Sequence, residues 1–235
     1  MQSLQKYRLL VIGTGLAVLV FTFVFVTNVN TRSVFKQNSQ GPDPVVEAVR
    51  RGGLREAAKI KGHYVSTERT TGWEKYDLEA LTQTSSEIIV GTPHLSSCSL
   101  TSSGDSIASE YQVRIDQTLK GKLKENRLIS IEVPGGKVTF DDGTSAEIKT
   151  PDLGPIVENE SYVWFLKPKD EGAEVFQLTG GGQGLFELSD SESGVKSRGD
   201  KVDVVQKHKG QPVVAFLEDT KVFVKKHPHT VPCCN

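Results

Sequence analysis

The sequence lacks the marks of a nucleic-acid-binding protein. Its 28 Lys and Arg residues are nearly balanced by 29 Asp and Glu residues, for a formal net charge of -1. Charges of both signs are mixed along the chain, and no basic run is longer than the pair Lys225–Lys226. Phosphate recognition needs clustered positive charge, so we expect no nucleic-acid partner.

Familiar catalytic motifs are also missing. There is no HExxH zinc-protease motif and no GxSxG nucleophile elbow. The glycine-rich segment 180–184 lacks the Lys-Ser/Thr pair of a phosphate-binding loop, and it predicts a flexible turn or bulge between strands. One polar stretch has the composition of a surface loop, so we assign no catalytic residue in it. It does hold residue types that nucleophilic catalysis uses: His94, Ser96, Ser97, Cys98 and Asp105.

Cysteine is scarce, and its number is odd. Cys98, Cys233 and Cys234 are the three cysteines. In an oxidising compartment they predict a disulfide staple between Cys98 and one of the C-terminal pair, with one thiol left over. The alternative is a zinc or copper site built from His227, His229 and the C-terminal cysteines. Because the spacing HxHxxxCC matches no usual structural zinc pattern, no metal or other cofactor is assigned.

A long apolar run is present near the N-terminus. Leu9 to Val26 is an uninterrupted stretch of 18 uncharged, apolar or small residues, and a spanning helix needs about 17–25. Lys6 and Arg8 precede the run, and no charge follows it until Arg32. The positive-inside rule therefore predicts a single-pass membrane protein with a cytoplasmic N-terminus and a periplasmic or extracellular main domain.

A cleaved secretory signal is the competing interpretation of this run. Signal peptides usually have an apolar region of about 7–15 residues that ends in a small-residue cleavage site. Here the run is longer, and residues 23–30 contain no such site. No cysteine lies nearby, so lipoprotein processing is excluded. We therefore expect an uncleaved anchor.

The rest of the chain divides by composition. Residues 1–8 are predicted to form a cytoplasmic tail and residues 9–29 the transmembrane anchor. Residues 30–72 are polar and proline-containing, which predicts a stalk with short, exposed helices, one of them starting at Asp43 and Pro44 and interrupted by glycines. Residues 73–225 are predicted to form a β-barrel domain, and residues 226–235 a flexible tail that carries the His and Cys cluster.

Short β-rich segments dominate the predicted domain. A helix at 77–83 leads into the run 87–91, and the most apolar segment, Tyr162 to Leu166, predicts a central strand. A closing helix is expected over 212–224. Further strands are expected at 111–116, 128–133, 138–140, 174–178 and 185–188. Many short strands joined by glycine-rich turns predict a mainly β fold, a barrel or sandwich with flanking helices.

Five of these segments together resemble a known group of proteins: Ile88-Ile-Val-Gly91, Leu119-Lys-Gly121, Gly135-Gly136, Tyr162-Val-Trp-Phe-Leu166 and Gln183-Gly-Leu-Phe186. The pattern looks like exported bacterial proteins of uncharacterised function, whose domain is similar to the OB-like barrel of tissue-inhibitor-of-metalloproteinase and netrin modules. The resemblance covers roughly residues 78–188 and implies a five-stranded barrel. The chain lacks the N-terminal Cys-x-Cys of the inhibitors, so protease inhibition is not implied.

These observations predict a membrane-anchored extracytoplasmic β-barrel module with a non-enzymatic binding or envelope-structural role. Its expected partners are the membrane, through the N-terminal helix, and a protein or glycan bound by the barrel. Two alternatives remain open. One is an enzyme, which would require His94, Cys98 or Asp105 to converge with another titratable group in one pocket. The other is a metal-handling protein that uses the C-terminal cluster.

Overall fold

The structure is a computed structural model that describes residues 43–68, 74–172, 174–189, 194–196 and 203–228. It is a mixed α/β fold with more strand than helix, and its strands form two sheets. The expected predominance of strands is confirmed. The predicted anchor, residues 9–29, lies outside the described residues, and no helix of the described part is both long and apolar enough to cross a bilayer.

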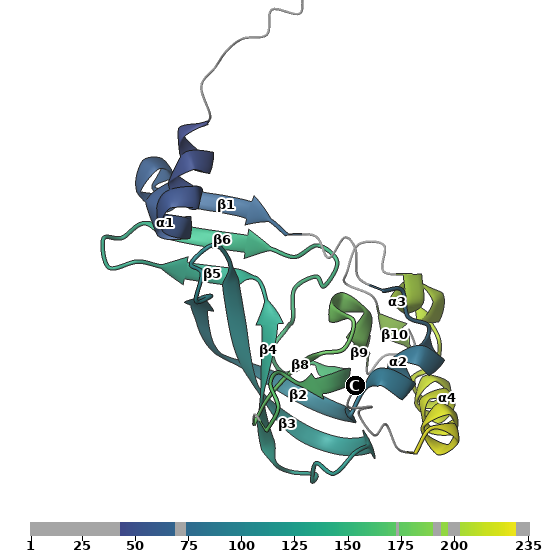
Figure 1. Ribbon diagram of the computed structural model, residues 1–235. Helices are drawn as coiled ribbons and strands as arrows, with labels where there is room; N and C mark the ends of the chain where they lie inside the picture. Colours follow the sequence, from purple (N-terminus) through teal and green to yellow (C-terminus); the bar gives the residue numbers. More distant parts are fainter. Residues whose placement is uncertain (1–42, 69–73, 173, 190–193, 197–202, 229–235) are drawn as a thin grey trace, which may run out of the picture. The chain divides into compact units, whose positions relative to one another are not determined.

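The larger sheet contains a ring of hydrogen-bonded strands (Figure 1). In the ring, β2 pairs with β3 and β7, β3 pairs with β4, β4 pairs with β8, and β8 pairs back with β7. Only the β4–β8 pairing is parallel. The ring strands are β2 (Glu87–Leu100), β3 (Ile107–Lys120), β4 (Leu128–Pro134), β7 (Ser161–Pro168) and β8 (Val175–Leu178), and β9 (Leu185–Leu188) and β10 (Val195–Lys196) extend the sheet beyond β7.

Strand β7 is buried on both faces, as its apolar sequence predicted. Tyr162, Trp164 and Leu166 belong to the core cluster that also holds inward residues of β3 and β4. Val163 and Phe165 point the other way, into a second core. Successive side chains alternate across a strand, so a strand that contacts two cores must be apolar at nearly every position. The Trp164 indole N–H donates to the Gly91 carbonyl at 3.0 Å, which satisfies its polar group inside the core.

Three helices build the second core against the strands. The core takes residues from α2 (Leu78–Thr84), α3 (Asp203–His208) and α4 (Val213–Lys226). The predicted helices at 77–83 and 212–224 are therefore confirmed. Asp77 caps α2 by accepting a hydrogen bond from the Ala80 N–H at 2.8 Å.

The smaller sheet carries the N-terminal helix. It contains β1 (His63–Thr67), β6 (Ser145–Lys149) and β5 (Gly136–Thr139), in that order, and α1 (Pro44–Lys61) packs against it (Figure 1). Helix α1 begins after Asp43, as expected, and is kinked at Gly52 and Gly53. Leu54 and Ala58 lie in a third core cluster with residues of β5 and β6. This burial differs from the exposed helices that the polar composition predicted.

Strands β2 and β3 are longer than their hydrophobic pattern indicated. The run at 87–91 predicted a short strand followed by a surface loop, but β2 continues to Leu100 and pairs with β3 along this extension. Residues 94–97 are exposed. Their backbone pairing, rather than an alternation of apolar and polar side chains, keeps them in the strand, which is why the loop prediction was wrong.

Candidate ligand-binding pocket

A cavity of about 530 Å³ opens where the ring meets the smaller sheet. It lies between the ends of β3 and β4, the hairpin of β5 and β6, and the loop that follows β6. Its apolar walls come from Val133, Pro134, Ile148, Pro151, Leu153, Pro155 and Ile156. Its polar side chains are Ser109, Tyr111, Lys137, Glu147, Lys149 and Thr150. This size and composition are typical of small-ligand pockets.

The wall formed by the loop after β6 is fixed from two sides. Leu153 is buried among the inward residues of the ring, so the loop closes over that core. The Val157 N–H donates to the Tyr162 hydroxyl at 2.9 Å. The Glu158 carboxylate accepts a hydrogen bond from the Leu95 N–H at 2.7 Å. These contacts tie the loop to both β7 and β2, so the cavity is formed before any ligand binds.

Some charged groups of the cavity lie near a group of opposite charge, and one does not. Glu147 lies 3.8 Å from both the Lys149 ammonium and the His63 imidazole. Lys137, which faces Glu147 across the β5–β6 pairing, has neither an ion pair nor a hydrogen bond within the part of the chain that the structure describes. The two lysines and one glutamate give the rim an excess of one positive charge.

Tyr111 and Ser109 lie on the same side of β3 and line the cavity together. Ser109 donates its hydroxyl hydrogen to the Gly135 carbonyl at 2.6 Å, so this donor is already used. The Tyr111 hydroxyl has no hydrogen-bond partner among the described residues. Burial raises the pKa of Tyr111, and the nearby Cys98, Tyr162 and Glu158 add to the effect. Tyr111 therefore remains a neutral phenol that can donate a hydrogen bond to a ligand.

The residues that catalysis would have required to converge are held by separate partners. His94 lies 3.2 Å from Glu158 on the protein surface. The Cys98 sulfur lies 3.3 Å from the Ser109 hydroxyl oxygen, beside the wall of the cavity rather than in its lining. Asp105 accepts hydrogen bonds from Thr101 and Ser103 within the β2–β3 turn. None of these three side chains is among the residues that line the cavity described above.

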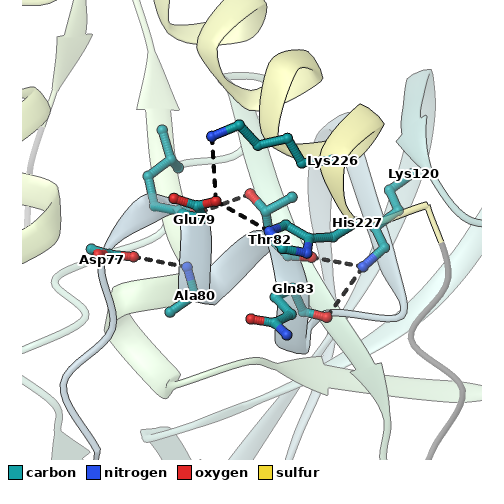
Figure 2. Close-up of polar contacts among 9 residues, drawn as sticks. Asp77, Glu79, Ala80, Thr82, Gln83, Lys120, Lys226 and His227 are labelled. Carbon is teal, nitrogen blue, oxygen red and sulfur yellow. Dashed lines mark hydrogen bonds and ion pairs between the residues drawn. The ribbon is translucent and has the colours of Figure 1, made fainter.

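The predicted C-terminal cluster is described only in part. His227 ends α4, and its Nε2 lies 3.1 Å from the Glu79 carboxylate of α2, which is also 3.5 Å from the Lys226 ammonium (Figure 2). His229, Cys233 and Cys234 lie outside the described residues. Within the described part, no group of three His, Cys, Asp or Glu side chains is placed to hold a metal, and Cys98 is a free thiol. The staple and the metal site both stay predictions.

The contact of Glu79 with His227 makes one pH-dependent contribution to stability. The hydrogen bond from His227 lowers the pKa of Glu79, burial opposes this, and the Lys226 charge adds to it. A carboxylate with a lowered pKa in the folded state stabilises the fold above its ordinary pKa and loses this contribution as the pH falls. We expect Glu79→Gln to lower the urea unfolding midpoint at pH 7 and to lower it less at pH 3.5, below the ordinary pKa of glutamate.

The control for this measurement is Glu171→Gln, which removes an exposed carboxylate that has no side-chain partner among the described residues. It should leave the midpoint unchanged at both pH values. A Glu79→Gln effect of the same size at pH 7 and pH 3.5 would contradict the proposed contribution of the ionised carboxylate.

Sequence reasoning did not identify the polar residues of the cavity. Tyr111 was recognised only as a strand residue, and Lys137 and Lys149 not at all. The available signal was two lysines that each adjoin a segment rich in proline and glycine, residues 134–136 and 150–155. Of the two tryptophans in the sequence, Trp164 is buried in the core, and Trp73 lies outside the described residues.

No protein-family model matches the chain, and no curated protein is significantly similar to it. The resemblance to inhibitor and netrin modules therefore remains a prediction.

Proposed function

We propose that this chain is a membrane-anchored extracytoplasmic binding module, and that the cavity beside Tyr111 is its ligand site. The apolar run of residues 9–26 supports the anchor. The observation that carries the binding function is the cavity itself, which combines apolar walls with two polar groups, Lys137 and Tyr111, that have no hydrogen-bond partner among the described residues.

The arrangement of the ring supports an OB-type barrel as the scaffold. Taken in chain order, the ring strands lie first, second, third, fifth, fourth, and the fourth pairs back with the first. The single parallel pairing joins the third and fifth strands. This order is the one expected of a five-stranded Greek-key barrel of the OB type, a scaffold that proteins use widely for binding. The hairpin β5–β6 and its following loop occupy the connection between the third and fourth strands, and they supply much of the cavity.

Three water-soluble probes that share one apolar body test this proposal: 4-phenylbutyrate, 4-phenylbutan-1-ol and 4-phenylbutylamine. Each is titrated by ligand-observed NMR against the full chain in lipid nanodiscs, with empty nanodiscs as the background. We expect at least one probe to bind, and Pro155→Trp to weaken its binding about tenfold, because the indole would fill the mouth of the cavity.

The matched control is Leu128→Trp. It adds the same ring at a position that is 63% exposed and does not line the cavity. It should change the affinity by less than about twofold. If none of the three probes gives binding that Pro155→Trp weakens, the cavity is not a ligand site and the proposed function is wrong.

A further inference from the structure

Side-chain hydrogen-bond donors that line the cavity are left without a partner in the described part of the chain. The Lys137 ammonium and the Tyr111 hydroxyl have no hydrogen-bond partner within the described residues, and Lys149 has only a 3.8 Å contact with Glu147. The one carboxylate among the residues that line the cavity, Glu147, lies 3.8 Å from both Lys149 and His63, so it offsets one of the positive charges of the rim. A ligand that satisfies these groups must therefore bring acceptors and negative charge.

The walls offer such a ligand little other polar recognition. Pro134, Pro151 and Pro155 have no backbone N–H, so these three wall positions cannot donate a main-chain hydrogen bond. The Gly135 N–H is used by the Ile107 carbonyl at 2.8 Å, and the Thr150 hydroxyl lies 3.4 Å from the Pro134 carbonyl. The other side chains of the wall, from Val133, Ile148, Leu153 and Ile156, are aliphatic. The body of the ligand must consequently be apolar, because a polar body would lose its hydration without compensation.

We propose that the cavity binds a small amphipathic carboxylate, with the carboxylate at Lys137 and Lys149 and the apolar body along the wall of Val133, Leu153 and Ile156. This inference rests on the proposed function, and it specifies the ligand class of the same site. The Tyr111 hydroxyl donates to the ligand beside the two lysines. Glu147 disfavours a second negative charge and keeps the site suited to a monoanion.

The same three probes distinguish a site for carboxylates from a site that binds any apolar ligand. They differ only in the end group, which is an anionic acceptor, a neutral hydroxyl or a cationic donor, so a difference in affinity reports on the charge and hydrogen bonding of that group. We expect 4-phenylbutyrate to bind about tenfold more tightly than the alcohol and the amine to bind most weakly. The double variant Lys137→Gln/Lys149→Gln should weaken 4-phenylbutyrate binding about fivefold to tenfold and leave binding of the alcohol within about twofold.

The control is the double variant Lys122→Gln/Lys124→Gln, which removes the same charge from exposed lysines in the β3–β4 turn. It should leave the affinity for 4-phenylbutyrate within about twofold, which would show that the effect is local rather than due to net charge. Equal, Pro155→Trp-sensitive binding of all three probes would overturn the carboxylate assignment while leaving the binding site in place. Loss of affinity in the control equal to that in the pocket variant would also overturn it.

Discussion

Replacing Lys120 with methionine is expected to lower the free energy of unfolding by about 2–4 kcal/mol. Lys120 ends β3 and is only 6% exposed. Its ammonium donates to the carbonyl oxygens of Thr82, at 2.7 Å, and Gln83, at 3.3 Å (Figure 2). It also donates to the Ser85 carbonyl at 2.7 Å. These carbonyls lie at the C-terminus of α2, where a helix leaves its last acceptors without internal partners.

The size of this effect follows from two opposing contributions. Methionine keeps the length and the apolar stem of lysine but has no hydrogens to donate, so the carbonyls at the end of α2 lose their partner. Against this, burial lowers the pKa of Lys120, which shows that the ammonium is itself costly to desolvate. We expect the lost hydrogen bonds to outweigh the removed desolvation cost, because the ammonium donates to three carbonyl oxygens and two of these hydrogen bonds are short.

Urea denaturation of the full chain, followed by circular dichroism, measures the difference. Lys124→Met is the matched control, because Lys124 is exposed and has no side-chain contact in the described part of the chain. It should change the free energy of unfolding by less than about 0.5 kcal/mol. If Lys120→Met lowers the free energy of unfolding by no more than the control does, the prediction is wrong. The free-energy cost of desolvating the Lys120 ammonium would then equal the stabilisation from its three hydrogen bonds.

What the sequence predicted well was determined by local pattern. The strand Tyr162 to Leu166 is apolar on both faces because each face contacts a different core, and a pattern of that strength needs no knowledge of the partners. The start of α1 could also be predicted from the sequence, since the Asp43 side chain caps the helix by accepting a hydrogen bond from the Val45 N–H at 2.9 Å. Caps and turns of this kind depend on neighbours in sequence, so a single chain reveals them.

Two strands of the smaller sheet, β1 and β6, were not predictable in the same way, whereas β5 overlaps the strand expected at 138–140. Strand β1 pairs in parallel with β6, although the two are separated by about eighty residues, and neither has a strongly apolar sequence. Tyr64 of β1 and Ala146 and Ile148 of β6 contribute to the core under α1, and each strand is only five residues long. Pairing with a distant strand makes these segments strands, and a local pattern does not contain that information.

The cavity depends on this same long-range pairing. Lys137 and Lys149 reach one rim because β5 and β6 form a hairpin, and Tyr111 joins them because the hairpin lies against the ends of β3 and β4. No spacing in the sequence brings these three residues together. Residues 94–98, which are contiguous and include residue types that nucleophilic catalysis uses, lie outside the lining of the cavity.

Gly182→Ala is expected to lower the free energy of unfolding by about 3 kcal/mol or more. The glycine-rich segment was predicted to be a flexible turn, and it is a turn, η1 (Gly181–Gly184), between β8 and β9, but it is closely packed. A Cβ at Gly182 would overlap the carbonyl oxygen of Asp152, and this neighbour is backbone that cannot rotate away. Gln183 limits movement of the turn, since its amide group bonds the backbone of Glu74 and Tyr76, each at 2.9 Å.

The substitution therefore has to move the loop after β6, which forms one wall of the cavity and buries Leu153 in the ring core. Urea denaturation gives the loss of stability, and amide hydrogen exchange should show faster exchange in residues 152–157 than elsewhere in the folded chain. Gly143→Ala is the control: it has a positive φ of 81° but no atom within 4 Å of an added Cβ, so it should cost only the backbone strain of about 1 kcal/mol. If Gly182→Ala lowers the free energy of unfolding by no more than Gly143→Ala does, η1 and the loop after β6 can separate at little cost. In that case η1 does not fix this wall of the cavity.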